Sequence, residues 1–165
     1  RYAKVDKNNL AAGIEPKFTV EPTGKYAAMG QKGLTDGIYG GATFADSWIG
    51  WEAKDGEFVL DLGKVQPVKT VEGDFLHQLG AWIFFPKSMT VSYSTDGNNY
   101  TTLGHVDNPE DRGVQVKFKK ISIDSPEPVD ARYIKVNIEG IKTCPGWHYG
   151  VGQPAWFFID EIVVK

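Results

Sequence analysis

Apolar and polar residues alternate with a period of two along most of this chain. The clearest stretches are 58–62, 89–94 and 134–138. Such alternation places successive side chains on opposite faces of an extended backbone, so each stretch predicts a half-buried β-strand. Turn residues at 94–100 separate the stretch 89–94 from 100–103 and predict a hairpin. Residues 156–164 predict an almost continuously apolar closing strand, and no stretch has a helical period with caps.

The alternation changes phase once, between residues 114 and 123. Val114, Val116 and Phe118 alternate with polar residues, and the apolar phase then moves to Ile121 and Ile123. This change predicts a β-bulge near 119–120.

The strands and the Gly- and Pro-containing turns between them predict an all-β, antiparallel β-sandwich in a single domain. Residues 1–33 are expected to form an extended lead-in, and residues 34–165 the sandwich. Long loops are expected at 35–52, 74–88, 105–113 and 140–155.

Composition narrows the function classes. The chain has 165 residues, enough for one domain with its own core, and a net charge of −3. That balance gives no reason to expect nucleic acid or an anionic membrane as partner, and no apolar run approaches the length of a transmembrane helix. Cys144 is the single cysteine, so no internal disulfide is expected. The chain begins at Arg1, and we expect it to be a processed piece of a longer protein.

The expected loops hold tryptophan beside histidine, glutamine and aspartate. Aromatic faces stack on the C–H-rich faces of sugars, and the polar groups hydrogen-bond sugar hydroxyls. The candidate carbohydrate-binding residues are Asp46, Trp48, His77, Gln78, Trp82, Trp147 and His148. Trp147 is the strongest, because Pro-Gly before it and His-Tyr-Gly after it describe an exposed loop tip. The alternative is that the tryptophans close the ends of the core, the role expected for Trp51 and Trp156.

Asp160 and Glu161 are adjacent carboxylates inside the apolar closing strand. A buried carboxylate needs a cation or strong donors. A calcium ion would serve, with Asp36 and Thr43 as further ligands from the glycine-rich loop. The alternatives are an ion pair with Arg132 or Lys135, or an edge position for the strand.

Catalytic patterns are poorly represented. The three histidines lack zinc-site spacing, and Cys144 and His148 have no helix to activate a thiolate. Residues 109–112 have the composition of a solvated turn, and no local pair of carboxylates suggests a glycosidase.

Several segments together resemble a known family. They are Leu34-Thr-Asp-Gly37, Glu57-Phe-Val-Leu-Asp-Leu-Gly63, the run Pro86 to Gly97 with Thr-Val-Ser-Tyr-Ser-Thr-Asp-Gly, Ala131-Arg-Tyr-Ile-Lys-Val136 and Phe158-Ile-Asp-Glu-Ile162. Their order and spacing over residues 30–165 are similar to the discoidin family, the coagulation factor V/VIII type C domains, which include the family 32 carbohydrate-binding modules. The resemblance implies a galactose-binding-domain-like jelly roll.

Two further segments, Gly80-Ala-Trp-Ile-Phe-Phe-Pro86 and Cys144-Pro-Gly-Trp-His148, resemble the C-terminal accessory domain of bacterial family 20 β-N-acetylhexosaminidases, or chitobiases. This resemblance implies a secreted, periplasmic or cell-surface bacterial parent enzyme, as in gut Bacteroidetes, whose catalytic domain would be a partner of this one.

The resemblance also implies a role for particular residues. Asp36 and Glu161, with Thr43 a weaker match, occupy places that help hold a structural Ca²⁺ in the relatives. The sugar site of the relatives lies in loops at one end of the sandwich, although this chain lacks their Arg or Asn beside His77.

The resulting hypothesis is a non-catalytic module that binds a terminal sugar, such as N-acetylglucosamine, N-acetylgalactosamine or galactose. The alternatives are a structural domain that packs on the catalytic domain without touching sugar and, least favoured, an independent enzyme.

Overall fold

The computed structural model describes residues 8–24, 33–45 and 47–165. In chain order the elements are β1 (Lys17–Val20), β2 (Ile49–Glu52), β3 (Gly56–His77), the 3-10 helix η2 (Leu79–Ala81), β4 (Ser88–Ser94), β5 (Thr101–Asp107), β6 (Lys117–Glu139) and β7 (Trp156–Val164). Every pairing between these strands is antiparallel. The expected hairpin is the β4–β5 pair, and the expected closing strand is β7.

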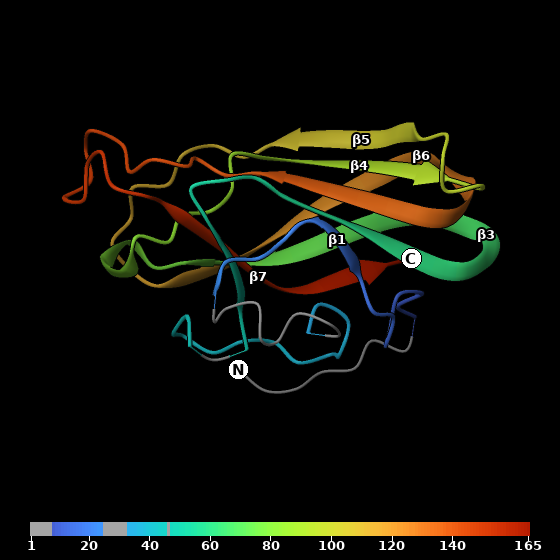
Figure 1. Cartoon of the computed structure of the whole chain (residues 1–165), viewed down its shortest axis with the longest axis horizontal. Coiled ribbons are helices and arrows are strands. Elements are labelled where there is room, and N and C mark those ends of the chain that lie inside the picture. The colour runs from blue at the N-terminus through green and yellow to red at the C-terminus, as the bar shows by residue number, and fades with distance from the viewer. Residues whose placement is uncertain (1–7, 25–32, 46) are drawn as a thin grey trace.

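Two long strands, β3 and β6, pass from one layer of the sandwich to the other (Figure 1). Residues 56–61 of β3 pair with β1 and with the second half of β6, which continues to β4 and β5. Residues 71–76 of β3 pair with β7 and with the first half of β6. The β3–β6 register shifts after Asp61 and again after Val68, between the two halves. The expected β-sandwich is confirmed.

The main core lies between the layers and is formed by alternate residues of both sheets. Its largest fully buried side chains include Trp51, Phe58, Phe75 and Phe157, and the rings of Trp51 and Phe157 stack with centres 5.1 Å apart. Trp51 is thus a core residue, as expected. Trp156 is half-buried and packs on a smaller cluster with Phe158 and Trp48.

The predicted bulge at 119–120 is wrong. The β3–β6 ladder runs without a register shift from Lys117 to Asp124. The strand keeps its regular in-and-out alternation, with Lys117 and Lys119 on the same side as Ile121. These two lysines can occupy that side because each ammonium group finds an acceptor: Lys117 Nζ donates to Asp111, and Lys119 Nζ donates to Asn108 Oδ1. The apolar residues of the preceding stretch therefore point outward, and Val114, Val116 and Phe118 are exposed.

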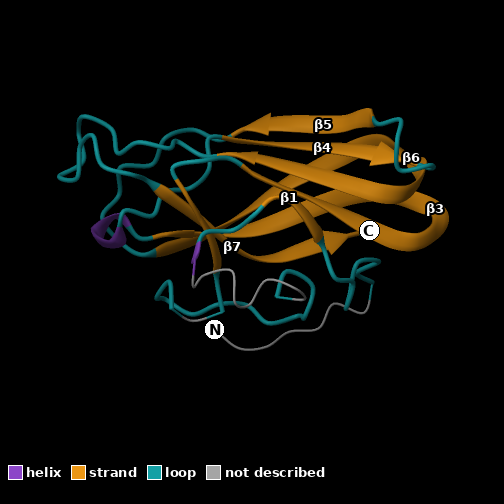
Figure 2. Ribbon diagram, viewed as in Figure 1, coloured by secondary structure: helices purple, strands orange, loops and turns teal. Residues whose placement is uncertain are grey.

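Three long loops gather at the end of the sandwich opposite the β4–β5 turn and the C-terminal end of β7 (Figure 2). They comprise the segment with η2 at 78–87, residues 108–116 and residues 140–155. Residues 35–45 instead lie along the β7 side of the sandwich, where Gly37 and Gly40 bond the side chains of Glu161 and Asp160. Within the described ranges, the chain forms no helix of the length and apolarity needed to cross a bilayer.

Candidate functional site

A pocket of about 490 Å³ opens among three of these loops. This volume is within the range of small-molecule sites, roughly 300–1,000 Å³. Its apolar lining is Phe84, Phe85, Pro86, Pro109, Ile141, Pro145 and Trp147, and its polar lining is Lys87, Asn108, Glu110, Asp111, Glu139, Lys142 and Thr143, with Gly140. An aromatic wall with a rim of hydrogen-bonding groups suits a ligand that has both apolar faces and hydroxyls.

Trp147 is held in the pocket wall from several sides. Its indole Nε1–H donates to Glu110, the Arg112 guanidinium lies 5.2 Å from its ring centre, and Phe84 meets it edge to face at 6.0 Å. Arg112 itself does not line the pocket. The ring is therefore fixed in orientation while one side remains on the cavity.

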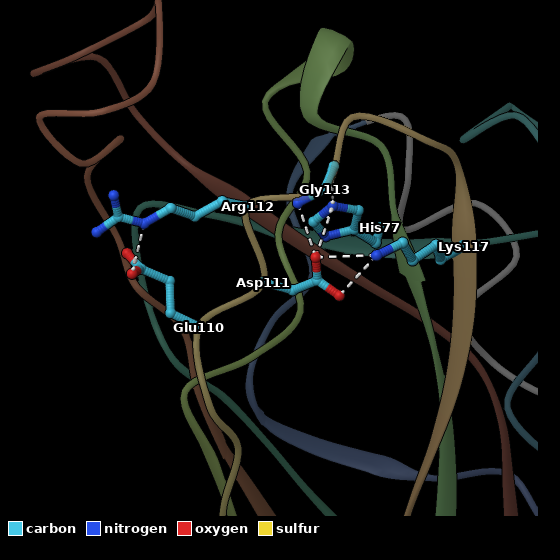
Figure 3. A network of polar contacts seen from close by, with 6 residues as sticks. All are labelled: His77, Glu110, Asp111, Arg112, Gly113 and Lys117. Atoms are coloured by element: carbon cyan, nitrogen blue, oxygen red, sulfur yellow. Dashed lines mark hydrogen bonds and ion pairs between the residues drawn. The ribbon is translucent and has the colours of Figure 1, made fainter.

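The adjacent acids Glu110 and Asp111 bind different partners (Figure 3). Glu110 and Arg112 point to one side of the loop and pair at 3.0 Å, whereas Asp111 points to the other. Asp111 accepts from the Gly113 N–H at 2.8 Å and from Lys117 Nζ at 3.0 Å. The loop 108–113 is thus tied to Trp147 and to β6, although Glu110 and Arg112 remain exposed, as expected of a solvated turn.

These contacts favour ionised carboxylates. The indole of Trp147 and the side chain of Arg112 lower the pKa of Glu110, and the bonds from Gly113 and Lys117 lower the pKa of Asp111. The other charged groups of the lining are also paired, Lys87 with Glu139 at 3.5 Å and Lys142 with Asp55 at 3.2 Å. The pocket therefore offers polar groups with little unpaired charge.

His77 lies behind this loop rather than in the pocket. Its side chain is fully buried against Phe85, and Nε2 is 2.7 Å from the Gly113 carbonyl and 4.0 Å from Asp111 Oδ1. The carbonyl bond requires a proton on Nε2. In this geometry His77 supports the loop and has no exposed face for a sugar.

His148 ties two loops together. Its ring is buried, with Nε2 2.8 Å from the Leu79 carbonyl and Nδ1 accepting the Gly150 N–H at 2.9 Å. Both ring nitrogens are engaged with backbone, which fixes the Nε2–H tautomer. His148 therefore connects the tip of loop 140–155 to η2, next to Trp147, and its nitrogens are not directed at a ligand.

Gln78 and Trp82 flank η2 and are absent from the pocket lining. Both are half-buried, and Trp82 adopts a left-handed backbone conformation with φ 61°. Its ring lies beside Tyr149, with centres 6.3 Å apart. The structure thus divides the predicted site into a Trp147 pocket and a Trp82 surface.

Trp48 occupies the second core cluster. It is 1% exposed, its Nε1–H donates to the Gly41 carbonyl at 2.9 Å, and its ring is stacked on Phe118 at 6.0 Å. Burial on the outer face of the β7 sheet leaves no face of its ring for a sugar, which argues against the predicted stacking role. Asp46 lies outside the described residues.

The adjacent carboxylates of β7 are accommodated by a β-bulge. Asp74 pairs with Glu161 and Phe75 with Ile159, so Asp160 is the extra residue between two ladder positions. Both carboxylates accept backbone N–H groups of the glycine-rich loop, Glu161 from Gly37 at 2.9 Å and Asp160 from Gly40 at 2.6 Å. The carboxylates therefore fasten this loop to the sheet.

The neighbouring groups differ from those the sequence suggested. Arg132 pairs with Asp61 at 2.9 Å, and Lys135 lies over the ring of Tyr100. Strand β7 lies between β2 and β3, so the edge alternative is also wrong.

Burial and the hydrogen-bonded carboxyl of Asp36 raise the pKa of Glu161 to about 10. Hard oxygen donors crowded in this way are the type that Ca²⁺ prefers, and a cation would relieve their repulsion. Asp36 and Glu161 fit such an ion as two ligands, and Thr43 lies exposed farther along the same loop. No cluster of three or more His, Cys, Asp or Glu side chains with metal-site geometry occurs in the described part of the chain, so carbonyl and hydroxyl oxygens would have to complete the shell.

The described residues give no support to a cysteine nucleophile. Cys144 is buried, and burial raises the pKa of its thiol. His148 has both ring nitrogens committed to backbone, so it does not act as the base.

Sequence reasoning missed most of the pocket wall. Phe84, Asn108 and Glu110 in the pocket wall were not among the candidates, nor was Arg112, which packs on Trp147 from outside the pocket. The only local sign was the composition of residues 108–112, whose acids and arginine are equally typical of a solvated turn.

Comparison with known proteins agrees with this architecture. The family model of the F5/8 type C domain matches residues 19–156, and the chain belongs to that family. No curated protein matches it.

Among solved structures, the chain is similar to CBM32-1 from a family 31 glycoside hydrolase of Clostridium perfringens, with TM-score 0.59, 15% identity and coverage of 96% of this chain and 97% of that one. It is similar to chitosan-binding module 1 of a chitosanase/glucanase from Paenibacillus sp. IK-5, with TM-score 0.59, 17% identity and coverage of 95% and 98%. It is also similar to CpGH89CBM32-4 of C. perfringens in complex with GlcNAc-α-1,4-galactose, with TM-score 0.57, 17% identity and coverage of 95% and 93%. At these identities the likeness establishes the shared fold.

Proposed function

We propose that this chain is a non-catalytic carbohydrate-binding module that holds a terminal sugar in the pocket beside Trp147. The observation that carries the proposal is the fixed indole ring on a cavity with a hydrogen-bonding rim. The glycan-binding modules with the same fold support the class of ligand. Because the charged groups at the pocket are paired, an uncharged sugar fits better than an acidic one.

Binding of a single sugar is expected to be weak, since so small a ligand gives limited contact area. A tethered module nevertheless raises the effective concentration of a catalytic domain at its glycan. We propose that the parent is a secreted or cell-surface bacterial glycoside hydrolase and, from the resemblance of residues 80–86 and 144–148, a β-N-acetylhexosaminidase.

Calorimetric titration with N-acetylglucosamine, N-acetylgalactosamine, galactose and chitobiose tests the binding function. We expect saturable binding to at least one sugar and loss of that binding in Trp147→Ala. Tyr100→Ala, at the β4–β5 end of the sandwich, is the matched control and should bind like the wild type. Binding that survives in Trp147→Ala would contradict the assigned site.

We also propose a structural Ca²⁺ at Asp36 and Glu161, with Thr43 as the weakest member of the set. The crowding of buried carboxylates under loop 36–41 supports it. Such an ion would fix this loop on the outer face of the β7 sheet and would take no part in chemistry.

One observation favours the second function, a structural domain that packs on its parent's catalytic domain. Val114, Val116 and Phe118 are exposed and apolar, and Val114 is 86% exposed. If no sugar gives heat at millimolar concentration, this face becomes the first place to look for a domain interface.

A further inference from the structure

Tyr149 is an exposed aromatic ring whose orientation is nevertheless fixed. It is 70% exposed, its hydroxyl donates to the Gly80 carbonyl at 2.5 Å, and its ring lies 4.4 Å from the buried ring of His148. A tyrosine held in this way offers contact area without a large loss of side-chain entropy on binding. An apolar ring kept at the surface by its own hydrogen bond is suited to stacking on a ligand.

Trp82 completes a corner beside Tyr149. Its N–H donates to the Leu79 carbonyl at 3.0 Å, and its own carbonyl accepts the Trp156 N–H at 2.9 Å. These bonds hold a tryptophan in the left-handed conformation, which costs free energy and is typical of functional positions. The buried indole Nε1–H of Trp82 has no hydrogen-bond acceptor among the described residues.

The loop between the two rings is built to bring them together. A Cβ atom at Gly150 would lie 2.7 Å from Trp82 Nε1, so only glycine allows the loop to pass this close. Tyr149 precedes that glycine and is thereby placed against η2. Neither Tyr149 nor Trp82 lines the Trp147 pocket.

The corner is nevertheless close to the pocket. The ring centre of His148 is 6.0 Å from that of Trp147 and 4.4 Å from that of Tyr149. The ring centres of Trp147 and Tyr149 therefore lie within about 10 Å of each other. A short glycan chain spans this distance. One unit against Trp147 would leave the next unit or two over the tip of the loop.

We propose that Tyr149 and Trp82 form a second contact site for the same glycan, so that the ligand is an uncharged oligosaccharide rather than a single terminal sugar. This inference rests on the proposed function, because it needs a first unit in the Trp147 pocket. The second sugar unit stacks on the ring of Tyr149, and the ring of Trp82 beside it contacts the edge of that unit.

The test compares a monosaccharide with an oligomer that contains it, using N-acetylglucosamine with N,N′,N″-triacetylchitotriose and galactose with lactose. The wild type should bind the oligomer of the accepted sugar about 3- to 10-fold more tightly, as one added aromatic contact allows. Tyr149→Ala should remove this gain and leave the affinity for the monosaccharide within about twofold. Tyr149→Phe keeps the ring and should keep most of the gain, and Tyr100→Ala controls for loss of a tyrosine elsewhere.

The outcomes separate the two proposals. Equal affinity for monosaccharide and oligomer in the wild type, or an equal loss for both in Tyr149→Ala, overturns the second site and leaves the first intact. Absence of binding to every sugar by a folded wild type overturns the binding function and, with it, this inference.

Discussion

The indole Nε1–H of Trp147 donates to the carboxylate of Glu110, a residue 37 positions earlier in the chain. This bond joins the loop before β6 to the loop before β7 and fixes the orientation of the ring in the pocket. Arg112 completes a triangle, paired with Glu110 at 3.0 Å and lying over the indole. The site is thus preorganised by two loops that share no local sequence pattern.

The Trp147–Glu110 bond predicts how binding depends on pH. The pKa of Glu110 is lowered from its ordinary 4.5, so its carboxylate persists in the folded protein down to and below that pH. Sugar affinity should stay constant from pH 7 to about 4.5 and fall only below it, as protonation releases Trp147 and Arg112. Calorimetry at several pH values, with folding checked by circular dichroism, measures this.

Glu110→Gln isolates the contribution of that carboxylate. Without the charge, affinity at pH 7 should be about 2- to 10-fold weaker, because a neutral amide oxygen accepts a weaker hydrogen bond than a carboxylate, and the fall below pH 4.5 should be reduced. If the sugar affinity of the wild type already falls between pH 7 and 5, a group other than Glu110 controls the pH dependence of binding.

His148 should contribute mainly to stability. His148→Ala removes a buried ring and its bonds to Leu79 and Gly150, which should lower the free energy of unfolding by about 2–4 kcal/mol. His105→Ala is the matched control, since that ring is 47% exposed and should change stability by less than about 1 kcal/mol. Urea denaturation compares them, and equal effects would show that His148 has no special role in joining the loops.

Calcium should raise the melting temperature of the wild type. A ligand at 100 times its Kd adds about 2.7 kcal/mol, equivalent to roughly 5–10 °C for a domain of this size. Glu161→Gln should lose that shift. Because the raised pKa of Glu161 favours its neutral form without a cation, the variant should melt close to the wild type in EDTA.

Asp130→Asn, at an exposed acid, is the control and should retain the calcium shift. A wild type that melts at the same temperature in calcium and in EDTA would refute the metal site.

Gly50 is required by close packing in β2. A Cβ atom there would lie 2.5 Å from the Phe158 ring, so Gly50→Ala should destabilise the protein by about 1–3 kcal/mol. Gly80→Ala places its Cβ in open space and should change the free energy of unfolding by less than about 1 kcal/mol. Thermal denaturation of both variants tests the contrast, and a neutral Gly50→Ala would mean that the ring moves freely.

The strand pattern was predictable because alternation reports burial directly. Residues 58–62, 89–94 and 134–138 lie in β3, β4 and β6, with Phe58, Val91 and Val136 fully buried. The same logic failed at Phe118, which is apolar but faces outward. Its neighbours Lys117 and Lys119 keep the inner side by reaching acceptors in the loop 108–111, a tertiary contact that no local pattern records.

Trp147 was the one tryptophan whose neighbours in the sequence predicted a position at a loop tip. Pro145 and Gly146 precede it, and Tyr149 follows it. Trp48 also follows a glycine-rich loop, and it is instead buried in a cluster with Leu76, Ile83 and Phe158. Whether a loop tryptophan is a platform or part of the core depends on what packs on it, and the sequence does not contain that information locally.

The sequence by itself determined the all-β sandwich, the hairpin at 94–100 and the presence of aromatic and polar residues in the end loops, because strand periodicity and turn chemistry act over a few residues. Only the tertiary structure decided that Glu110 and Arg112 hold Trp147, that His77 and His148 face backbone, and that a bulge at Asp160 turns two adjacent carboxylates toward one loop. Those outcomes depend on contacts between segments 30 to 120 residues apart, and their geometry is set by how the two sheets and their loops close on each other.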